Sequence, residues 1–385
     1  FEKGRLLDSQ ILESSTVDSQ LKGQAEPPVQ LKKYLGEKSW YFRDANWDPH
    51  FPASGTKAEW FLEKGTNRKT EGTIALNLNF VQKLLKILGP VEFEKSGESI
   101  TSNNLFERAE YYSVKKEGAK DFLGQTVMAI FIKAKQVKEG DWFKLSQVVN
   151  QGLEEKELLL SLYDKKPAVF FNKRGWDGAI RKTAFQETVL TDYLMIVETN
   201  LSASKVNYFI EREVVQEINI LDTGEIEEKT TLVYQNNSPS EKQPGGSYKN
   251  YLRLYLPQQS EIFSVKIGKD QESLTSLEPA KIDLFVEHGK QVAGFFLEIP
   301  VQERWIVEVN YRLADKFIFD KELFSYAFYW QKQPGVMEDD FRFQINYPQG
   351  FKPVEVVPEA KVSEGQVFFE TTALKDRLFL ISFNK

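Results

Sequence analysis

The sequence predicts an α+β or α/β domain over residues 1–199, followed by an antiparallel β-sandwich region over residues 200–385. Two patterns of apolar residues support this division. Up to about residue 199, short apolar runs alternate with segments whose apolar residues recur every three or four positions, as strands and helices do in an α/β layer. From Lys205 onward, apolar residues recur at every second position, which is typical of strands with one buried face.

The composition excludes several classes of function. The chain has 385 residues, of which 41% are hydrophobic and 28% charged, and its length is enough for two or three domains. The net charge of −6 argues against a nucleic-acid partner, because phosphate binding needs a basic face. Cysteine is absent, which excludes disulfides, zinc–thiolate sites and thiol nucleophiles. His50 and His288 are the only histidines and lie far apart in sequence, so a histidine triad is not expected.

The clearest local pattern in the first domain is a strand–helix–strand unit between Thr73 and Phe93. The short apolar run Thr73–Leu76 predicts a strand that is buried on both faces. Asn79 is expected to cap the following helix, and Gly89 with Pro90 to end it. Val91 and Phe93 then alternate with glutamates, as in a half-exposed strand. The apolar stripe of this helix is Val81, Leu84, Leu85 and Leu88.

Further elements complete the first domain. The turn Glu2–Arg5 and a strand around Leu6–Leu12 suggest that the opening strands of the domain are missing from this chain. Helices are predicted from Pro52 to Gly65 and from Asp121 to Val137, and a third is predicted to be capped by Asp141 and to end at Gly152. Tyr193–Val197 is predicted to be a buried strand. The expected inward stripe of the second helix is Leu123, Val127, Ile130, Phe131 and Ala134.

The second region is predicted to contain strands only. A long strand from Val206 to Ile220 is followed by the turn Asp222–Gly224 and a returning strand. The regular spacing of the later strands predicts one large or two small sandwiches, with a split expected near residues 314–322.

The strongest candidate for a functional site is the polar segment Arg43–Asp48. Arg43 could bind a phosphate or carboxylate through two hydrogen bonds, and Asp44 and Asp48 could hold Mg²⁺. The catalytic candidates are therefore Arg43 and Asp44, the metal-binding candidates are Asp44 and Asp48, and the binding set is Arg43, Asn46, Trp47 and Asp48. The alternative is structural, with local bonds at Arg43 and Asp44 and with Trp47 filling the core.

Two other motifs have structural explanations of their own. Gly175-Trp176-Asp177-Gly178 is typical of a tight turn with an aromatic anchor. The acidic run Glu338-Asp339-Asp340 could bind Ca²⁺, although a solvated turn between strands explains it as well.

Several long segments resemble an uncharacterised bacterial family known as DUF 4012, a domain of unknown function. The segments include WYFRDANWDPHFP, NLNFVQKLLKILGPV, the GWDG turn and TDYLMIVETNLSASKVNYFIERE, so the resemblance covers essentially the whole chain. Members of the family usually carry an N-terminal transmembrane helix. The resemblance therefore implies an extracytoplasmic protein at the cell surface, anchored to the membrane by a segment upstream of Phe1.

More remotely, the first domain resembles the LytR–CpsA–Psr fold, whose members transfer lipid-pyrophosphate-linked glycopolymers to the cell wall. The similarity lies in Arg43-Asp44 and in Gly89-Pro90-Val91, on either side of the predicted strand and helix. Those transferases carry several arginines on the helices that follow. The corresponding segment here, DFLGQTVMAIFIKA, has none.

These observations lead to two hypotheses. The first is a membrane-anchored protein of the bacterial cell envelope that has a binding or structural role and needs no cofactor. The alternative is a Mg²⁺-dependent phosphotransferase that attaches lipid-pyrophosphate-linked glycopolymer to the cell wall through Arg43 and Asp44. A cell-wall or surface glycopolymer and a second copy of the chain are the partners consistent with the first hypothesis.

Overall fold

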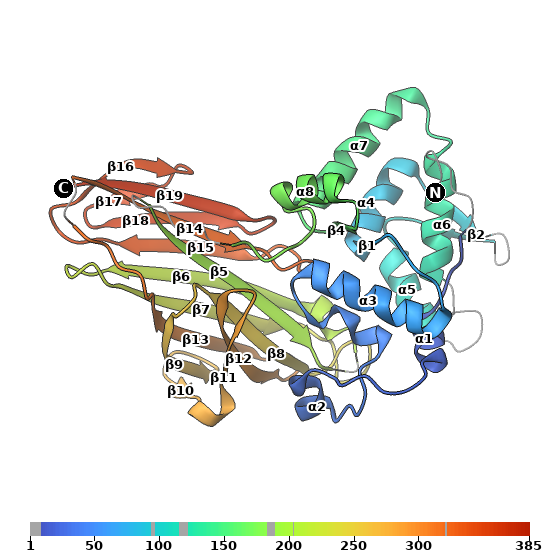
Figure 1. Cartoon of the computed structure of the whole chain (residues 1–385), viewed down its shortest axis with the longest axis horizontal. Helices are drawn as coiled ribbons and strands as arrows, with labels where there is room; N and C mark the ends of the chain where they lie inside the picture. Colours follow the sequence, from blue (N-terminus) through green and yellow to red (C-terminus); the bar gives the residue numbers. More distant parts are fainter. Residues whose placement is uncertain (1–8, 94–96, 115–121, 183–188, 203, 320–321) are drawn as a thin grey trace. The chain divides into compact units, whose positions relative to one another are not determined.

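The computed structural model describes residues 9–93, 97–114, 122–182, 189–202, 204–319 and 322–385. The chain divides into two compact units, Phe1–Ala179 and Ile180–Lys385 (Figure 1). The first is mostly helical and has two small sheets, and the second is built from two large sheets. The division falls before the strand at Tyr193–Val197, which apolar spacing had assigned to the first domain. The reason is that this strand pairs with strands of the second unit.

The helices of the first unit account for most of its described residues. None of the helices that the structure describes combines the length and apolar character needed to span a bilayer. The elements of the unit are α1 (Ser14–Gln20), α2 (Val29–Leu35), the 3₁₀ helix η1 (Phe42–Trp47), α3 (Phe51–Thr66), β1 (Gly72–Leu76), α4 (Leu78–Leu88), β2 (Val91–Phe93), β3 (Glu98–Ile100), α5 (Leu105–Val114), α6 (Phe122–Ala134), α7 (Glu139–Glu154), β4 (Leu158–Leu162) and α8 (Lys165–Arg174).

The strand predicted at Thr73–Leu76 forms, but it is not buried on both faces. As β1 it pairs antiparallel with β4, in a sheet that has two strands among the described residues. Ile74 and Leu76 are 60% and 41% exposed, because the small sheet leaves part of one face uncovered. The other sheet of the described first unit, β2–β3, is also antiparallel. The unit is therefore mixed α and β, without a parallel sheet in the part that the structure describes.

Helix α4 follows the predicted pattern closely. Val81, Leu85 and Leu88 are buried, as the spacing of the apolar stripe indicated. The cap is Asn77 rather than Asn79, since its side-chain oxygen accepts the backbone N–H of Phe80 at 2.9 Å.

The buried face of α6 and the start of α7 differ from the predictions. In α6 the buried residues are Phe122, Thr126 and Ile130, whereas Leu123 is 49% exposed, so the predicted stripe is rotated by about one position. Helix α7 begins before Asp141, with Lys138 at the cap position. The predicted strand around Leu6–Leu12 lies partly outside the described residues, and residues 9–12 are not in a strand.

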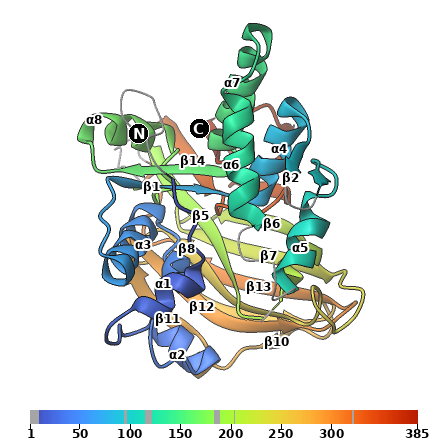
Figure 2. The same ribbon diagram turned by 90° about the vertical axis from the view of Figure 1, so that its right-hand side faces the viewer.

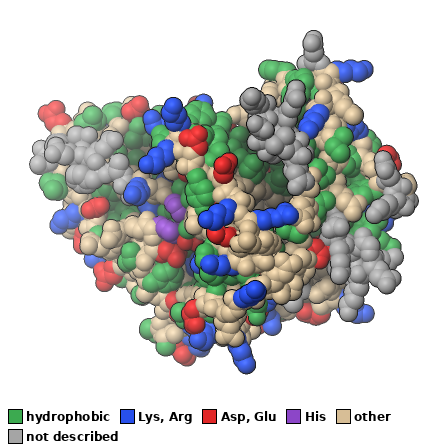
Figure 3. Space-filling model, turned by 45° about the vertical axis from the view of Figure 1, so that its right-hand side comes forward, with side chains coloured by type: hydrophobic (Ala, Val, Ile, Leu, Met, Phe, Trp, Pro, Cys, Tyr) green, Lys and Arg blue, Asp and Glu red, His purple; other side chains and the backbone are tan. Residues whose placement is uncertain are grey.

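The N-terminal end of α7 extends beyond the other elements of the first unit (Figures 1 and 2). In Figure 3, hydrophobic and basic side chains lie together at this end, at the top of the view. Helix α7 packs against α4 and β4, and Gly152 near its C-terminal end lies against the ring of Phe80 in α4.

In its described residues, the second unit contains strands and two short 3₁₀ helices. The segment Val206–Phe209, predicted as the start of a long strand, is a 3₁₀ helix, and the strand begins at Ile210. The elements are β5 (Val189–Asn200), η2 (Val206–Phe209), β6 (Ile210–Ile220), β7 (Ile226–Asn236), β8 (Tyr248–Leu256), β9 (Glu261–Gly268), β10 (Thr275–Ser276), η3 (Pro279–Lys281), β11 (Asp283–Glu287), β12 (Lys290–Ile299), β13 (Arg304–Arg312), β14 (Leu323–Gln331), β15 (Asp340–Asn346), β16 (Lys352–Val357), β17 (Lys361–Ser363), β18 (Gln366–Thr372) and β19 (Arg377–Asn384).

These strands form one sandwich. One sheet has eight strands, in the order β10-β9-β13-β7-β6-β15-β18-β17, and the other has seven, in the order β11-β12-β8-β5-β14-β19-β16. Two parallel pairs, β5–β14 and β6–β15, join strands that lie before residues 314–322 to strands that lie after them. A split into two sandwiches near 314–322 is therefore wrong, because both sheets continue across it.

A single apolar core fills the space between the two sheets. Leu254 and Phe328 from the seven-stranded sheet belong to the same cluster as Val214 and Val307 from the eight-stranded sheet, and all four are fully buried. Alternate residues of each strand face this core, as the period of two predicted.

Candidate functional site

The candidate segment Arg43–Asp48 is a short helix rather than an open loop. Phe42–Trp47 forms η1, in which Ala45 is buried while Arg43 and Asn46 are exposed. Asn46 has non-helical backbone angles, φ −86° and ψ 23°, so the helix is distorted one residue before its end. Trp47 is half-buried.

Arg43 is held by acidic side chains. Its guanidinium also lies over the ring of Tyr41, at 4.3 Å from the ring centre. The side chain is still 47% exposed, but these contacts surround its positive charge with carboxylates. The carboxylates within ion-pair distance of Arg43 are those of Asp18 at 3.7 Å, Glu37 at 3.2 Å and Asp44 at 3.6 Å.

Asp44 also takes part in local structure. Burial raises the pKa of its carboxyl, the positive charge of Arg43 opposes this rise, and the nearby Glu37 and Asp18 add to it. The backbone carbonyl of Asp44 accepts the indole N–H of Trp40 at 2.9 Å. Asp18 in turn accepts the backbone N–H of Phe42 at 2.6 Å, which ties α1 to the start of η1.

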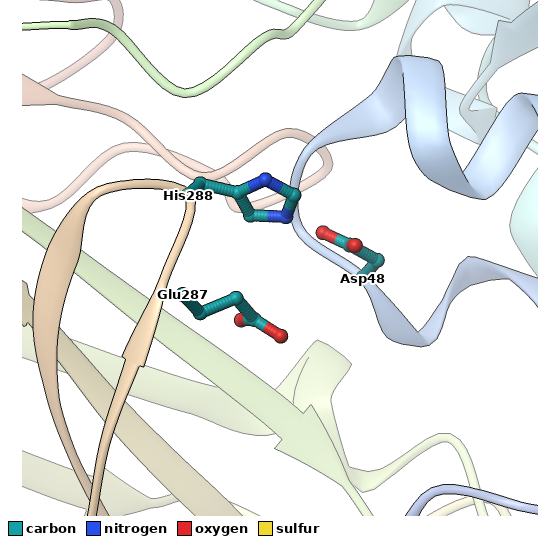
Figure 4. Close-up of side chains that lie close together, drawn as sticks. All are labelled: Asp48, Glu287 and His288. Carbon is teal, nitrogen blue, oxygen red and sulfur yellow. The ribbon is translucent and has the colours of Figure 1, made fainter.

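Asp48 forms the junction between η1 and α3. Its carboxylate accepts the backbone N–H of His50 at 2.8 Å, and its carbonyl accepts the hydroxyl of Ser54 at 2.6 Å. In the described part of the first unit, neither Asp44 nor Asp48 comes together with two further metal-ligating side chains. Figure 4 shows Asp48 after η1, and it also shows Glu287 and His288 of the second unit at the turn between β11 and β12.

A surface depression of about 630 Å³ lies elsewhere in the first unit, near the end of α3. Leu12 is the one large apolar side chain of its lining, so it does not provide a groove for a polyprenyl chain. Its basic residues, Lys22, Lys64 and Arg68, lie near a helix C-terminus, whose dipole disfavours anions. None of the predicted site residues lines it.

The two other motifs have structural roles. Gly175 caps α8 with φ 78°, and Trp176 donates its indole N–H to Glu154 at 3.0 Å, so the predicted turn with an aromatic anchor is confirmed. Asp339, from the acidic run near 338–340, is neither solvated nor available for Ca²⁺. It is 3% exposed and accepts a hydrogen bond from Arg212 at 3.0 Å.

Sequence patterns missed a polar cluster inside the sandwich. Asp192 on β5 and Glu228 on β7 come from different sheets, are fully or almost fully buried, and lie close enough for each carboxyl group to affect the pKa of the other. Tyr326 donates its hydroxyl to Asp192, and Glu228 accepts from Tyr311 at 2.7 Å and from Gln216 at 2.6 Å. Both residues occupy positions of the alternating strand pattern that face the core, and this placement could have identified them from the sequence.

Burial raises the pKa of both carboxyl groups. The pKa of Asp192 rises from 3.8 to about 6, because desolvation outweighs the hydrogen bonds and the charge of Lys290 that oppose it. Desolvation and the neighbouring Asp192 raise the pKa of Glu228 well above its ordinary value. The pair therefore holds a proton at pH values at which free carboxyls are ionised.

The fold and these sites define a two-unit protein, with a helical unit followed by a β-sandwich. Residues 1–112 match the family described as "Protein of unknown function (DUF4012)", so the family resemblance is confirmed over that stretch. No curated protein matches the chain. The LytR–CpsA–Psr resemblance stays a prediction.

Solved structures share only a limited likeness with this chain. A candidate nutrient-binding protein of Legionella pneumophila is 6% identical with a TM-score of 0.32, and the match covers 51% of this chain and 72% of that one. An M1 zinc metallopeptidase of Deinococcus radiodurans is 10% identical with a TM-score of 0.24, and the match covers 45% of this chain and 42% of that one. A candidate protease of Parabacteroides distasonis is 6% identical with a TM-score of 0.23, and the match covers 46% of this chain and 41% of that one. At these scores the likeness carries no inference about activity.

Proposed function

We propose that this chain is the extracytoplasmic part of a bacterial cell-envelope protein with a binding or structural role. The family resemblance supports the location, with an anchor in the membrane upstream of residue 1. A cell-wall or surface glycopolymer is the partner class that fits this location.

The surroundings of Arg43 are the observation that favours a non-catalytic role. A pyrophosphate clamp needs an arginine whose N–H groups are available to phosphate oxygens. Arg43 is surrounded by the carboxylates of Asp18, Glu37 and Asp44, which would repel a pyrophosphate and would have to be displaced by it. The alternative, a Mg²⁺-dependent phosphotransferase with a LytR–CpsA–Psr-like fold, requires that Arg43 be released from these pairs.

Calorimetric titration with a polyprenyl-pyrophosphate analogue and Mg²⁺ separates the two hypotheses. We expect no saturable heat with the wild-type chain. Arg43→Ala should lower the free energy of unfolding by about 1–2 kcal/mol, because three acidic side chains lose their shared cation while partly exposed to solvent. Arg68→Ala, which removes an exposed arginine elsewhere in the first unit, is the control and should leave stability unchanged.

Saturable binding of the analogue that Arg43→Ala abolishes and Arg68→Ala preserves would favour the transferase. A binding role is tested by sedimenting the wild-type chain with purified cell-wall polymer, and the location by protease treatment of intact cells. Retention of the chain in the supernatant, or full protection inside intact cells, would contradict the proposal.

A further inference from the structure

The free end of α7 exposes large apolar side chains. Trp142 and Phe143, in the first turns of the helix, are 50% and 69% exposed. Ile132, in the last turn of α6 and close in sequence to the start of α7, is 54% exposed. Such a concentration of exposed apolar residues at the end of a helix usually marks an interaction surface.

The packing of α7 explains why these residues are uncovered. Leu145 and Leu153 are buried, and Gly152 lies so close to the ring of Phe80 that a Cβ atom would be 2.5 Å from it. Trp142 lies three positions before Leu145 and continues the same stripe. Half of the Trp142 side chain is exposed, so this part of the stripe is only partly covered.

Basic residues surround this apolar end. The segment from residue 131 to residue 145 contains four lysines and two acidic residues, although the whole chain has a net charge of −6. Lys135 and Lys138 are exposed. Lys144 pairs with Asp141 at 3.0 Å, and Lys133 donates to the carbonyl of Pro90 at 2.6 Å. The end of α7 is therefore locally positive.

We propose that the end of α7 and the connection that leads into it bind the surface of an anionic lipid bilayer. Tryptophan and phenylalanine are suited to the boundary between head groups and acyl chains, and lysines beside them can reach lipid phosphates. A second copy of the chain is a poorer partner for this surface, because it would bring the same lysines together. Binding to lipid depends on neither the location nor the role proposed above, and it can be measured on the purified chain.

Flotation of the intact chain with phosphatidylglycerol–phosphatidylcholine vesicles tests the proposal. We expect the chain to float with these vesicles, to float far less with phosphatidylcholine alone, and to be released by salt. Trp142→Ser with Phe143→Ser should reduce flotation to background. Lys135→Glu with Lys138→Glu should weaken binding about tenfold or more, because each lysine near an anionic surface contributes to the affinity.

Matched controls distinguish binding through this surface from non-specific binding of the chain to lipid. Leu284→Ser with Val286→Ser removes two side chains of similar exposure from β11, and Lys352→Glu with Lys361→Glu reverses two exposed lysines of the second unit. Both control variants should float as the wild-type chain does, and all variants should keep its melting temperature. Equal flotation of the α7 variants and the wild-type chain, or equal binding to neutral and anionic vesicles, would overturn the proposal. So would a shift from dimer to monomer on substitution of Trp142 and Phe143 without any lipid binding.

Discussion

The buried carboxyls of Asp192 and Glu228 should make the stability of the second unit fall as the pH rises. Both pKa values are higher in the folded chain than in the unfolded chain. At pH values between the unfolded pKa and the folded pKa, the folded state therefore binds more protons than the unfolded state. The stabilisation is fully present below the unfolded pKa of about 4 and is lost as the pH rises through the folded pKa, about 6 for Asp192. The loss continues at higher pH as Glu228 ionises.

The magnitude follows from the shift and from full burial. Raising the pKa of a carboxyl from 3.8 to about 6 corresponds to about 3 kcal/mol of stability. Asp192→Asn removes this titration and keeps one accepting oxygen, whereas the two carboxylate oxygens of Asp192 accept from Tyr326 and from the backbone N–H of Tyr193. The lost hydrogen bond shifts the stability of the variant by a similar amount at every pH, so we expect its stability relative to the wild-type chain to rise by about 3 kcal/mol between pH 4 and pH 8.

Urea denaturation at several pH values measures this difference, and hydrogen exchange of peptides from β5 and β7 assigns it to the second unit. Asp222→Asn, an exposed change in the turn between β6 and β7, is the matched control and should leave the pH profile unchanged. Parallel pH profiles for the wild-type chain and Asp192→Asn would refute the reasoning, since they would show that Asp192 titrates alike in the folded and unfolded states.

Two further predictions concern packing, and both are measured by chemical denaturation. Leu85→Ala should lower the free energy of unfolding by about 2–5 kcal/mol because it leaves a cavity beneath α4. Lys86→Ala, on the exposed face of the helix, should leave it nearly unchanged. Equal effects of the two substitutions would mean that the buried stripe of α4 is misassigned. Gly224→Ala should lower the free energy of unfolding far more than Gly289→Ala does. Both positions have positive φ, but a Cβ at Gly224 would lie 2.0 Å from the carbonyl oxygen of Phe317, and one at Gly289 meets nothing within 4 Å.

Local periodicity was enough to predict several elements. The stripe of α4, the buried run in β5 and the alternation within β6 depend on neighbours a few positions away, and the structure confirms all three. The rotated face of α6 shows the limit of this approach. In a helix that is apolar on most sides, the buried face is chosen by its packing partners rather than by its own spacing.

The surroundings of Arg43 could not be predicted, because two of its partners come from other elements. Asp18 lies on α1, a helix that apolar spacing did not indicate, and Glu37 follows α2. The sequence therefore showed an arginine and an aspartate in a polar segment, as a phosphate site would, but not the carboxylates that occupy the arginine. A pattern identifies which residue types are present, while their availability to a ligand depends on contacts between distant segments.

The carboxyl pair in the sandwich illustrates the same limit in the core. Asp192 and Glu228 each lie at an inward position of an apolar strand, so the sequence could have indicated two buried acids, each costly if left unpaired. Their proximity depends on how the two sheets pack face to face, because Asp192 lies on the seven-stranded sheet and Glu228 on the eight-stranded sheet. Replacing the pair with apolar residues of similar volume would remove the cost of desolvation. The pair instead places two carboxyl groups from opposite sheets near each other, which is favourable only while at least one of them is protonated. Each carboxyl takes its hydrogen bonds from its own sheet: Tyr326 on β14 donates to Asp192, and Tyr311 and Gln216 on β13 and β6 donate to Glu228. These bonds offset part of the cost of burying the two acids, because a buried polar group is costly chiefly when it has no partner.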